Sequence, residues 1–276
     1  MDYAKTYRYL INSKKSLYEI ADVAYFDVFE EADVYPIILS IHEAKSIKIS
    51  KNIIESDSGF VDNTQQLNWS LYLQDGFEIY SKTVEKFDRL CNLQNISIAS
   101  SATVSEAYEL AETIGDDAHG ELKVINTGTI DPYVTLWGIT AMQYLKKKYN
   151  TPTVSVSKIK NKQWTRLPKV IIAGMGLRVE AFFDEYGVYL PAKSTVVVYA
   201  ENSKISMKYL LSLFNSKFIS YIFKVANQFN GMAGGYMNIN KNNISEESIK
   251  TEAVQSEGNN QSRSEEHTSE LQSHLM

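Results

Sequence analysis

One segment of the sequence has the parts of a phosphate-binding turn. The apolar run KVIIA is followed by Gly174 and Gly176, and Glu201 ends a second apolar run about 25 residues further on. In a dinucleotide-binding unit, glycines let the turn after a strand approach the diphosphate, a helix begins at once, and a later acid binds the ribose. Here Val179 stands in the place of the third glycine, and the helix that would follow is short. We therefore predict a turn between two strands, with a nucleotide site at Gly174–Glu201 as the alternative.

A second candidate for chemistry is the tripeptide Asp131-Pro132-Tyr133. Enzymes that methylate a base amine hold the amine with Asn, Asp or Ser followed by two prolines and an aromatic residue, which stacks on the flipped base. In this sequence one proline is absent, and Trp137 lies too far along the chain to take the aromatic position. The tripeptide therefore favours a turn after the segment Asn126–Thr129, and it is not predicted to be catalytic.

Nucleophilic and metal chemistry have little support. His42 and His119 have no serine or cysteine elbow beside them that they would activate. The single Cys91 excludes an intramolecular disulfide, and one cysteine with four histidines leaves too few ligands for a structural zinc site. We therefore predict no catalytic, cofactor-binding or metal-binding residue in this chain.

The charges of the sequence are distributed unevenly. The net charge is −5, yet nine basic residues and no Asp or Glu lie between Lys146 and Arg178. Five more lysines, again without an acid, lie between Ser203 and Asn243. A basic half in a mildly acidic chain is expected of a protein that turns one face toward a polyanion. A solvated system of lysine-rich loops explains the same charges equally well.

The elements that would position these residues are clearest in the second half of the chain. Residues 105–115 predict a helix with Ser105 as N-cap and Gly115 as C-cap. Residues 205–227 have apolar side chains at helical spacing, with a break at Asn215-Ser216. The predicted strands are the short apolar runs 121–126, 168–173, 186–190 and 194–200. A helix is also possible at about Leu177–Tyr186 if the glycine turn binds a nucleotide.

The first half contains fewer clear elements. Residues 3–20 predict one or two short helices broken near Asn12-Ser13. The run YPIILSI, residues 35–41, is apolar throughout, as in a strand that a parallel sheet buries on both faces. A helical stretch follows at residues 78–90. Together with the second half, these elements predict an α+β fold.

Composition places the chain among ordinary globular proteins. Its 276 residues allow one large domain or two small ones, and hydrophobic and charged residues make up 44% and 22%. No apolar run approaches the roughly 18 residues that a membrane-spanning helix needs, and the first residues lack the layout of a signal peptide. We expect a soluble, cytoplasmic protein with no membrane partner.

Several segments, taken in their order along the chain, resemble one family. They are YFDVFEEADVYPIILSI (25–41), SEAYELAETIG (105–115), KVINTGTIDPY (123–133) with Trp137-Gly138, KVIIAGMGLRVEAFFDEYGVYL (169–190), YLLSLFNSKFISYIF (209–223) and GGYMNINKNNI (234–244). The first resembles the end of the catalytic domain of adenine-specific DNA methyltransferases from type IIG restriction–modification systems. The next two resemble the opening of their target-recognition region. The last three resemble the TaqI-like C-terminal specificity domain, whose helix carries a phrase similar to Leu213–Lys217.

The resemblance implies a function in recognising double-stranded DNA. It implies that residues 1–45 are a remnant of the methyltransferase sheet, 46–95 a connecting region, 96–245 the mixed α/β target-recognition domain and 246–276 a disordered or artefactual tail. The catalytic machinery and the S-adenosylmethionine site of the full-length parent are expected upstream, in a methyltransferase domain or subunit. RSEEHTSELQSHLM, residues 263–276, resembles a translated sequencing adapter, so we expect a truncated reading frame.

Residue type and region together provide the candidate DNA contacts. Basic side chains neutralise phosphates, and Asn, Gln, Arg and Lys read base edges. The segment from Gln228 to Lys241 combines amide side chains with glycines, which let a backbone approach DNA, although a plain surface loop has the same composition. The predicted phosphate contacts are Lys158, Lys160, Lys162, Arg166, Lys169 and Arg178. The predicted groove contacts are Asn230, Asn238, Asn240 and Lys241.

Two alternatives stay open at the level of the sequence. The first is a small stand-alone enzyme with a nucleotide or S-adenosylmethionine site at Gly174–Glu201. The second is a non-catalytic specificity subunit that recruits a separate methyltransferase.

Overall fold

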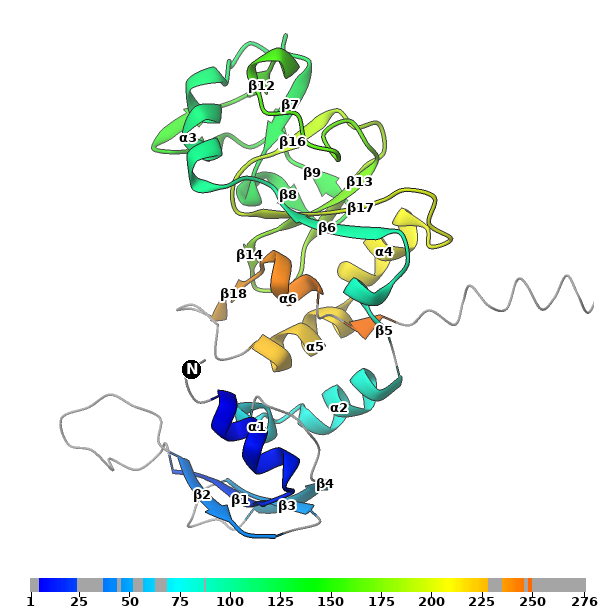
Figure 1. The fold of residues 1–276 in the computed structure, drawn as a ribbon. Coiled ribbons are helices and arrows are strands. Elements are labelled where there is room, and N and C mark those ends of the chain that lie inside the picture. The colour runs from blue at the N-terminus through cyan, green and yellow to red at the C-terminus, as the bar shows by residue number, and fades with distance from the viewer. Residues whose placement is uncertain are drawn as a thin grey trace, which may run out of the picture. The chain divides into compact units, whose positions relative to one another are not determined.

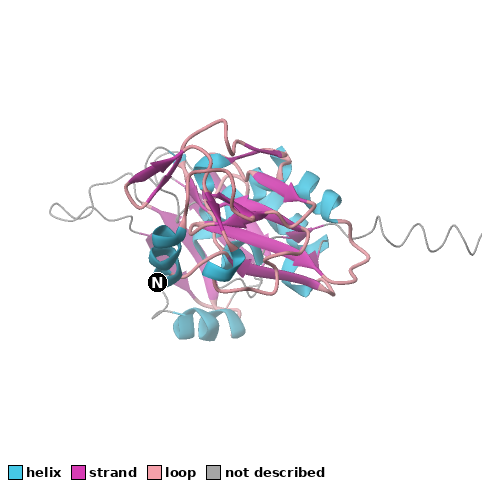
Figure 2. Cartoon of the chain, turned by 90° about the horizontal axis from the view of Figure 1, so that it is seen from above, coloured by secondary structure: helices cyan, strands magenta, loops and turns pink. Residues whose placement is uncertain are grey.

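The structure, a computed structural model, is a mixed α+β protein (Figure 1). It describes residues 5–23, 37–43, 46–51, 57–62, 69–86, 88–227, 235–245 and 248–249. The chain forms two compact units, Met1–Ile79 and Tyr80–Met276. Helices and strands occur throughout the described residues, as the cyan and magenta elements of Figure 2 show. Within these residues, no helix combines the length and the apolar character that a membrane crossing requires.

The first unit is a four-stranded sheet with a helix against it. The helix α1 spans Lys5–Ser13, and the strands are β1 (Leu17–Asp22), β2 (Ile37–Ile41), β3 (Ser46–Lys51) and β4 (Asp57–Asp62). Their order is β2-β1-β3-β4, with β1 parallel to β3 and antiparallel to β2. Leu17, Ile20 and Ile47 pack with Trp69 and Tyr72 into its core. The 3-10 turn Trp69–Leu73 supplies both aromatic residues.

Two expectations for this unit are wrong. The second part of residues 3–20 is the strand β1, where helix was predicted. The apolar run 35–41, described from Ile37 on, forms the edge strand β2, which pairs antiparallel with β1 on one side only. Ile38 and Ile41 are 51% and 52% exposed, so the strand is not buried on both faces. An apolar run indicates a strand, but it does not determine whether a second strand or a helix covers it. Residues 25–36 of the methyltransferase-like segment lie outside the described residues.

The second unit is built on a central antiparallel sheet. Its strands are β6 (Ile96–Ser100), β13 (Lys169–Ala173), β15 (Ala181–Asp184) and β17 (Thr195–Ala200), in the order β15-β13-β17-β6. Side chains alternate between the two faces of a strand. Val170 and Ile172 therefore join one buried cluster, while Ile171 and Ala173 join another on the opposite face. Burial on both faces explains why β13 and β17 are almost purely apolar.

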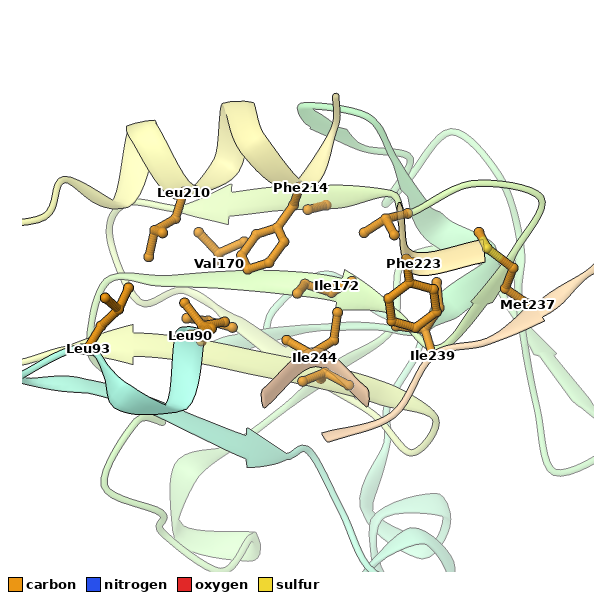
Figure 3. Close-up of a cluster of buried hydrophobic side chains, with 14 residues drawn as sticks. Leu90, Leu93, Val170, Ile172, Leu210, Phe214, Phe223, Met237, Ile239 and Ile244 are labelled. Atoms are coloured by element: carbon orange, nitrogen blue, oxygen red, sulfur yellow. The ribbon is translucent and has the colours of Figure 1, made fainter. Parts of the chain in front are cut away.

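Helices cover one face of this sheet. They are α4 (Met207–Phe214), α5 (Lys217–Asn227) and the short α6 (Lys241–Ser245). Leu210 and Phe214 point from α4 toward Val170, and Phe223 of α5 completes the cluster (Figure 3). The helices break at Asn215-Ser216 as predicted.

The side chain of Asn215 gives the segment Leu213–Lys217 a structural role at the end of α4. Its side-chain oxygen accepts a hydrogen bond from the Ala181 amide at 2.9 Å, and its amide group donates to the Ala181 carbonyl at 3.0 Å. Since β15 is an edge strand, Ala181 has one side free of sheet partners. The asparagine therefore ties the end of α4 to the edge of the central sheet.

A smaller sheet and the helix α3 cover the other face (Figure 1). The helix α3 spans Val104–Thr113, and the sheet has the order β12-β7-β16, with β7 at Leu122–Ile125, β12 at Thr153–Val154 and β16 at Tyr189–Pro191. Thr103, two residues before the predicted Ser105, is the N-cap and forms a capping box with Glu106.

The remaining elements are short. They are α2 (Phe77–Lys86), β5 (Asp88–Arg89), β8 (Ile130–Asp131), β9 (Val134–Thr135), β10 (Met142–Tyr144), β11 (Lys147–Tyr149), β14 (Met175–Gly176), β18 (Met237–Asn238) and β19 (Ser248–Ile249). β19 pairs with β5, although it lies in the segment predicted to be a disordered or artefactual tail. The adapter-like residues 263–276 lie outside the described residues.

Candidate nucleic-acid interface

Lys169 is a structural residue inside the second unit. Its ammonium group lies 2.7 Å from the Asp184 carboxylate, and the two side chains are 0% and 1% exposed. The same ammonium group donates to the carbonyl groups of Thr165 and Leu167. Burial lowers the pKa of Lys169, and the negative charge of Asp184 opposes that shift. A side chain with no exposed area cannot contact a phosphate, so Lys169 is not part of a DNA-binding surface in this structure.

Lys162 and Lys160 share one acid at the start of α3. The Lys162 ammonium group lies 2.7 Å from Glu106 and also donates to the Ser101 carbonyl at 2.7 Å. Lys160 lies 3.6 Å from the other oxygen of Glu106, and its side chain is 75% exposed. The hydrogen bond from Lys162 lowers the pKa of Glu106 to about 2. Lys162 is thus held in place, whereas Lys160 is free to reach outward.

Arg166 and Arg178 make looser pairs. Arg166 lies 3.1 Å from Glu121, and Arg178 lies 3.2 Å from Glu180. Exposed pairs of this kind contribute about 0–1 kcal/mol to stability. Both arginines can therefore exchange a carboxylate for a phosphate at small cost. Lys158 is exposed and has no acidic partner among the residues that the structure describes.

The short ladder between β14 and β18 gathers a second group of predicted contacts. Met175 pairs with Asn238 across this ladder, and Arg178 follows β14 closely in the chain. Asn238 and Lys241 are exposed. The Asn240 side-chain oxygen accepts from the amides of Asn242 and Asn243, so it caps the start of α6. Asn230 lies outside the described residues.

The predicted contacts therefore form two groups. Lys158, Lys160 and Lys162 border the side of the central sheet that carries α3, while the ladder β14–β18 borders the side that carries α4, α5 and α6 (Figure 1). The structure does not bring them together into one patch.

The packing of the chain explains why position 174 is a glycine, without any cofactor. A Cβ at this position would lie 2.0 Å from the Ser194 carbonyl oxygen, so no other residue fits the close approach of the two chain segments. Thr127 bridges the two segments, because its hydroxyl accepts a hydrogen bond from the Gly174 amide and donates one to the Ser194 carbonyl. The strand β15 follows the turn and pairs antiparallel with β13. The predicted turn between two strands is confirmed, and the helix that a nucleotide site needs is not formed.

Asp131-Pro132-Tyr133 is also a turn, as predicted. It joins the paired strands β8 and β9. The Tyr133 backbone has φ +70°, and its amide donates to the Ala181 carbonyl at 2.8 Å. The turn is thereby fastened to the central sheet.

Sequence reasoning missed the hairpin formed by β10 and β11. Lys146, Lys147 and Lys148 at its end are exposed, and none has an acidic partner among the described residues. These lysines belong to the basic half of the chain but are not among the predicted DNA contacts. The sequence contains one signal for this hairpin. Apolar and polar residues alternate from Met142 to Tyr144, three adjacent lysines follow at 146–148, and Tyr149 comes next.

The cleft beside α3 is too small for a cofactor. Glu106, Lys158, Lys162 and Trp164 line it together with residues of β16, and its volume is about 60 Å³. Sites for small molecules have volumes of roughly 300–1,000 Å³. This cleft is therefore too small to hold S-adenosylmethionine.

Comparison with known proteins identifies this part of the chain. Residues 123–247 match the family model described as the TaqI-like C-terminal specificity domain. A search of curated proteins finds no match. Among solved structures, one similar chain is titled "Characterization and crystal structure of the type IIG restriction endonuclease BpuSI", with a TM-score of 0.43 and 12% identity. The alignment covers 91% of this chain and 38% of that one, so the chain spans well under half of that structure's length.

Proposed function

Since residues 123–247 are a TaqI-like C-terminal specificity domain, we propose that the chain is the DNA target-recognition part of an adenine-specific DNA methyltransferase. The family match carries the proposal, because a specificity domain of this family recognises a DNA target in restriction–modification. The catalytic domain would belong to an upstream methyltransferase domain or subunit, with this chain as a truncated fragment. It would act in the cytoplasm, where it grips duplex DNA and presents the adenine to be flipped.

The exposed cations support a DNA-facing role. Lys158 and Lys160 are free to reach a phosphate, and Arg178 can exchange Glu180 for one. Arg166 can likewise exchange Glu121 for a phosphate, whereas Lys162 contacts phosphate only if it releases Glu106, which it holds at 2.7 Å. We therefore expect Lys162 to contribute less to DNA affinity than the other four.

Groove contacts are proposed for Asn238 and Lys241, which are exposed beside the ladder β14–β18. Asn240 is a weaker candidate, since its side-chain oxygen already caps α6. Its amide group remains available as a donor to a base edge.

The cofactor and the methyl transfer are assigned to the upstream part of the parent. The turn at Gly174 supports this assignment, because the Ser194 carbonyl oxygen lies close over Gly174, where a phosphate-binding turn would need open space. The chain alone should therefore transfer no methyl group to DNA. Tritium from labelled S-adenosylmethionine appearing in DNA with the purified chain would contradict this assignment.

Fluorescence polarisation of the full chain with random duplex DNA at two salt concentrations tests the proposal. We expect binding that weakens steeply with salt, because each neutralised phosphate releases counterions. A site-selection screen should then enrich one short sequence. A folded chain that binds no DNA at low salt would overturn the proposed function.

A further inference from the structure

We propose that the hairpin β10–β11 enters a groove of duplex DNA and that Gln143 and Lys148 on its exposed face contact base edges. The inference rests on the proposed function and assigns part of the target specificity to residues 142–149. It depends on four properties of the hairpin, namely its anchoring, its exposed face, its strained tip and its charge.

The base of the hairpin is anchored in the domain. Met142, Tyr144 and Tyr149 are 1%, 6% and 7% exposed and belong to the cluster under α3. The Tyr144 hydroxyl donates to the Ala107 carbonyl of α3 at 3.2 Å. The Asn126 side chain donates to the Gln143 carbonyl at 2.8 Å. The hairpin is therefore held at its root while its other face and its tip remain in solvent.

The exposed face presents one amide and one ammonium group side by side. Gln143 and Lys148 are directly opposite each other in the ladder, and both are exposed. A two-stranded ribbon fits the major groove of DNA, which is about 12 Å wide. Gln pairs with two atoms of adenine there, and Lys donates to the acceptor atoms of guanine. The pair has the chemistry to read two neighbouring bases.

The tip is held in a conformation that its residues disfavour. Leu145 and Lys146 both have left-handed backbones, with φ of 42° and 70°. Such a turn is usually made by Asn-Gly, because a residue with a larger side chain is disfavoured in the left-handed conformation. Strain of this kind clusters at functional sites. Here the strained turn places Leu145, 39% exposed, at the end of the hairpin, where it can contact sugar or a thymine methyl group.

The charge of the hairpin is not neutralised within the described part of the chain. Lys146, Lys147 and Lys148 have no acid within ion-pair distance there. Asp116 lies near the end of β11, but its carboxylate accepts hydrogen bonds from the Asn150 and Thr151 amides. Three adjacent cations repel one another, and a polyphosphate backbone relieves that repulsion. Duplex DNA is the occupant that satisfies the charge, the ribbon shape and the paired base-reading groups together.

Two charge-matched double variants test the inference in the full chain. K147Q/K148Q removes two cations from the hairpin, and K217Q/K224Q removes two exposed cations from α5, on the other side of the central sheet. We expect the hairpin variant to weaken binding to random duplex about tenfold. The slope of log affinity against log salt concentration should fall by about 2 in magnitude. The α5 variant should change both the affinity and this slope far less. Equal losses in both variants would overturn the proposal.

Two further variants separate recognition from structure. L145N/K146G replaces the strained tip with the residues that the turn prefers, so we expect a hairpin of equal or higher stability that binds DNA more weakly. Q143A should relax selection at one base position by about tenfold, with random-duplex affinity nearly unchanged. Unchanged DNA binding by L145N/K146G together with unchanged selection by Q143A would contradict the inference.

The outcomes also separate this inference from the proposed function. If the unaltered, folded chain fails to bind any duplex, the proposed function fails, and the hairpin assignment fails with it. If the unaltered chain binds and selects a sequence but all the hairpin variants behave like it, only the hairpin assignment fails. Urea denaturation of every variant shows whether a lost signal reflects lost folding.

Discussion

Two lysine-rich segments of the second unit contain the same side chains in different surroundings. In residues 158–169, Lys160 and Lys162 meet Glu106, Arg166 meets Glu121 and Lys169 meets Asp184. In residues 146–148, no lysine meets an acid within the described residues. The longer segment dominates the charge count, yet most of its cations already serve the fold. The number of basic residues in a segment therefore overstates the charge that it offers to DNA.

The acids that neutralise the longer segment come from other parts of the chain. Glu106 lies in α3, Glu121 precedes β7 and Asp184 ends β15. The lysines of the hairpin are exposed and have no acidic partner among the described residues. The comparison predicts that the firmly paired cations of the first segment, Lys162 and Lys169, matter for stability, and the cations of the hairpin for binding.

The largest effect should come from the most deeply paired cation. K169M leaves Asp184 buried without its partner, which costs about 3–5 kcal/mol of the free energy of unfolding. D184N should also destabilise the fold, because the Val188 and Tyr189 amides donate to different oxygens of Asp184 and the single asparagine oxygen can accept from only one of them. Urea denaturation measures both, with the exposed Lys224→Met as a control expected to change stability by less than about 0.5 kcal/mol. A K169M protein as stable as the control would show that the pair does not hold the fold.

A crossed comparison of two double variants sharpens the distinction between the segments. K160Q/K162Q should lower the free energy of unfolding by about 1–2 kcal/mol, because Glu106 loses a partly buried partner. K147Q/K148Q should leave stability unchanged and weaken DNA binding about tenfold. The measurements are urea denaturation and fluorescence polarisation on the same samples. A larger loss of affinity in K160Q/K162Q than in the hairpin variant would break the comparison.

The contribution of the Lys162–Glu106 ion pair to stability should depend on pH. Lys162 lowers the pKa of Glu106 from 4.5 to about 2 in the folded chain. A carboxyl group with a lowered folded-state pKa stabilises the protein above pH 4.5, and that contribution is lost as the pH falls toward 2. We expect a contribution of about 1–2 kcal/mol, less than the full shift implies because both side chains are partly exposed.

The acid response is measured as the free energy of unfolding against pH for the unaltered chain and for E106Q. The two curves should differ most near neutral pH and converge in acid. Parallel curves across this range would mean that Glu106 is not held by Lys162 in solution.

The smallest effect should come from the exposed pair. The side chains of Arg166 and Glu121 are 47% and 51% exposed. R166Q should change the free energy of unfolding by less than about 1 kcal/mol, and added salt should remove even that difference. A cost above about 2 kcal/mol, measured by urea denaturation, would place Arg166 with Lys169 among the structural cations.

Elements with a strong local pattern were predictable from the sequence. The strands at 121–126, 168–173 and 194–200 are confirmed, and so is the helix break at Asn215-Ser216. Their apolar residues follow a period of two or of 3.6, or form short uninterrupted runs, and these patterns depend only on neighbouring residues. The resemblance to the TaqI-like specificity domain is confirmed by the family match, since the order of such segments is also a property of the sequence. The predicted domain boundaries and most DNA contacts stay predictions.

Other features depended on packing that the sequence does not display. The strand β1 was predicted as helix, because the spacing of its apolar residues suits both structures over so short a stretch. The strand β2 was expected to be buried, but it lies at the edge of its sheet. The residues of the Gly174 turn also suit a nucleotide site, and only the close approach of the Ser194 carbonyl oxygen shows why the fold needs glycine there.

The sequence by itself determined the resemblance to the TaqI-like specificity domain, the strands of the central sheet and the presence of a basic half, because these follow from residue types and short-range order. Only the tertiary structure decided which basic residues are free. Lys169 and Lys162 find their acids 15 and 56 residues away, across contacts that folding alone creates. Lys147 and Lys148 find none among the described residues, since the hairpin buries Met142, Tyr144 and Tyr149 and leaves these lysines exposed. Charge is a property of the chain, but its availability to DNA is a property of the fold.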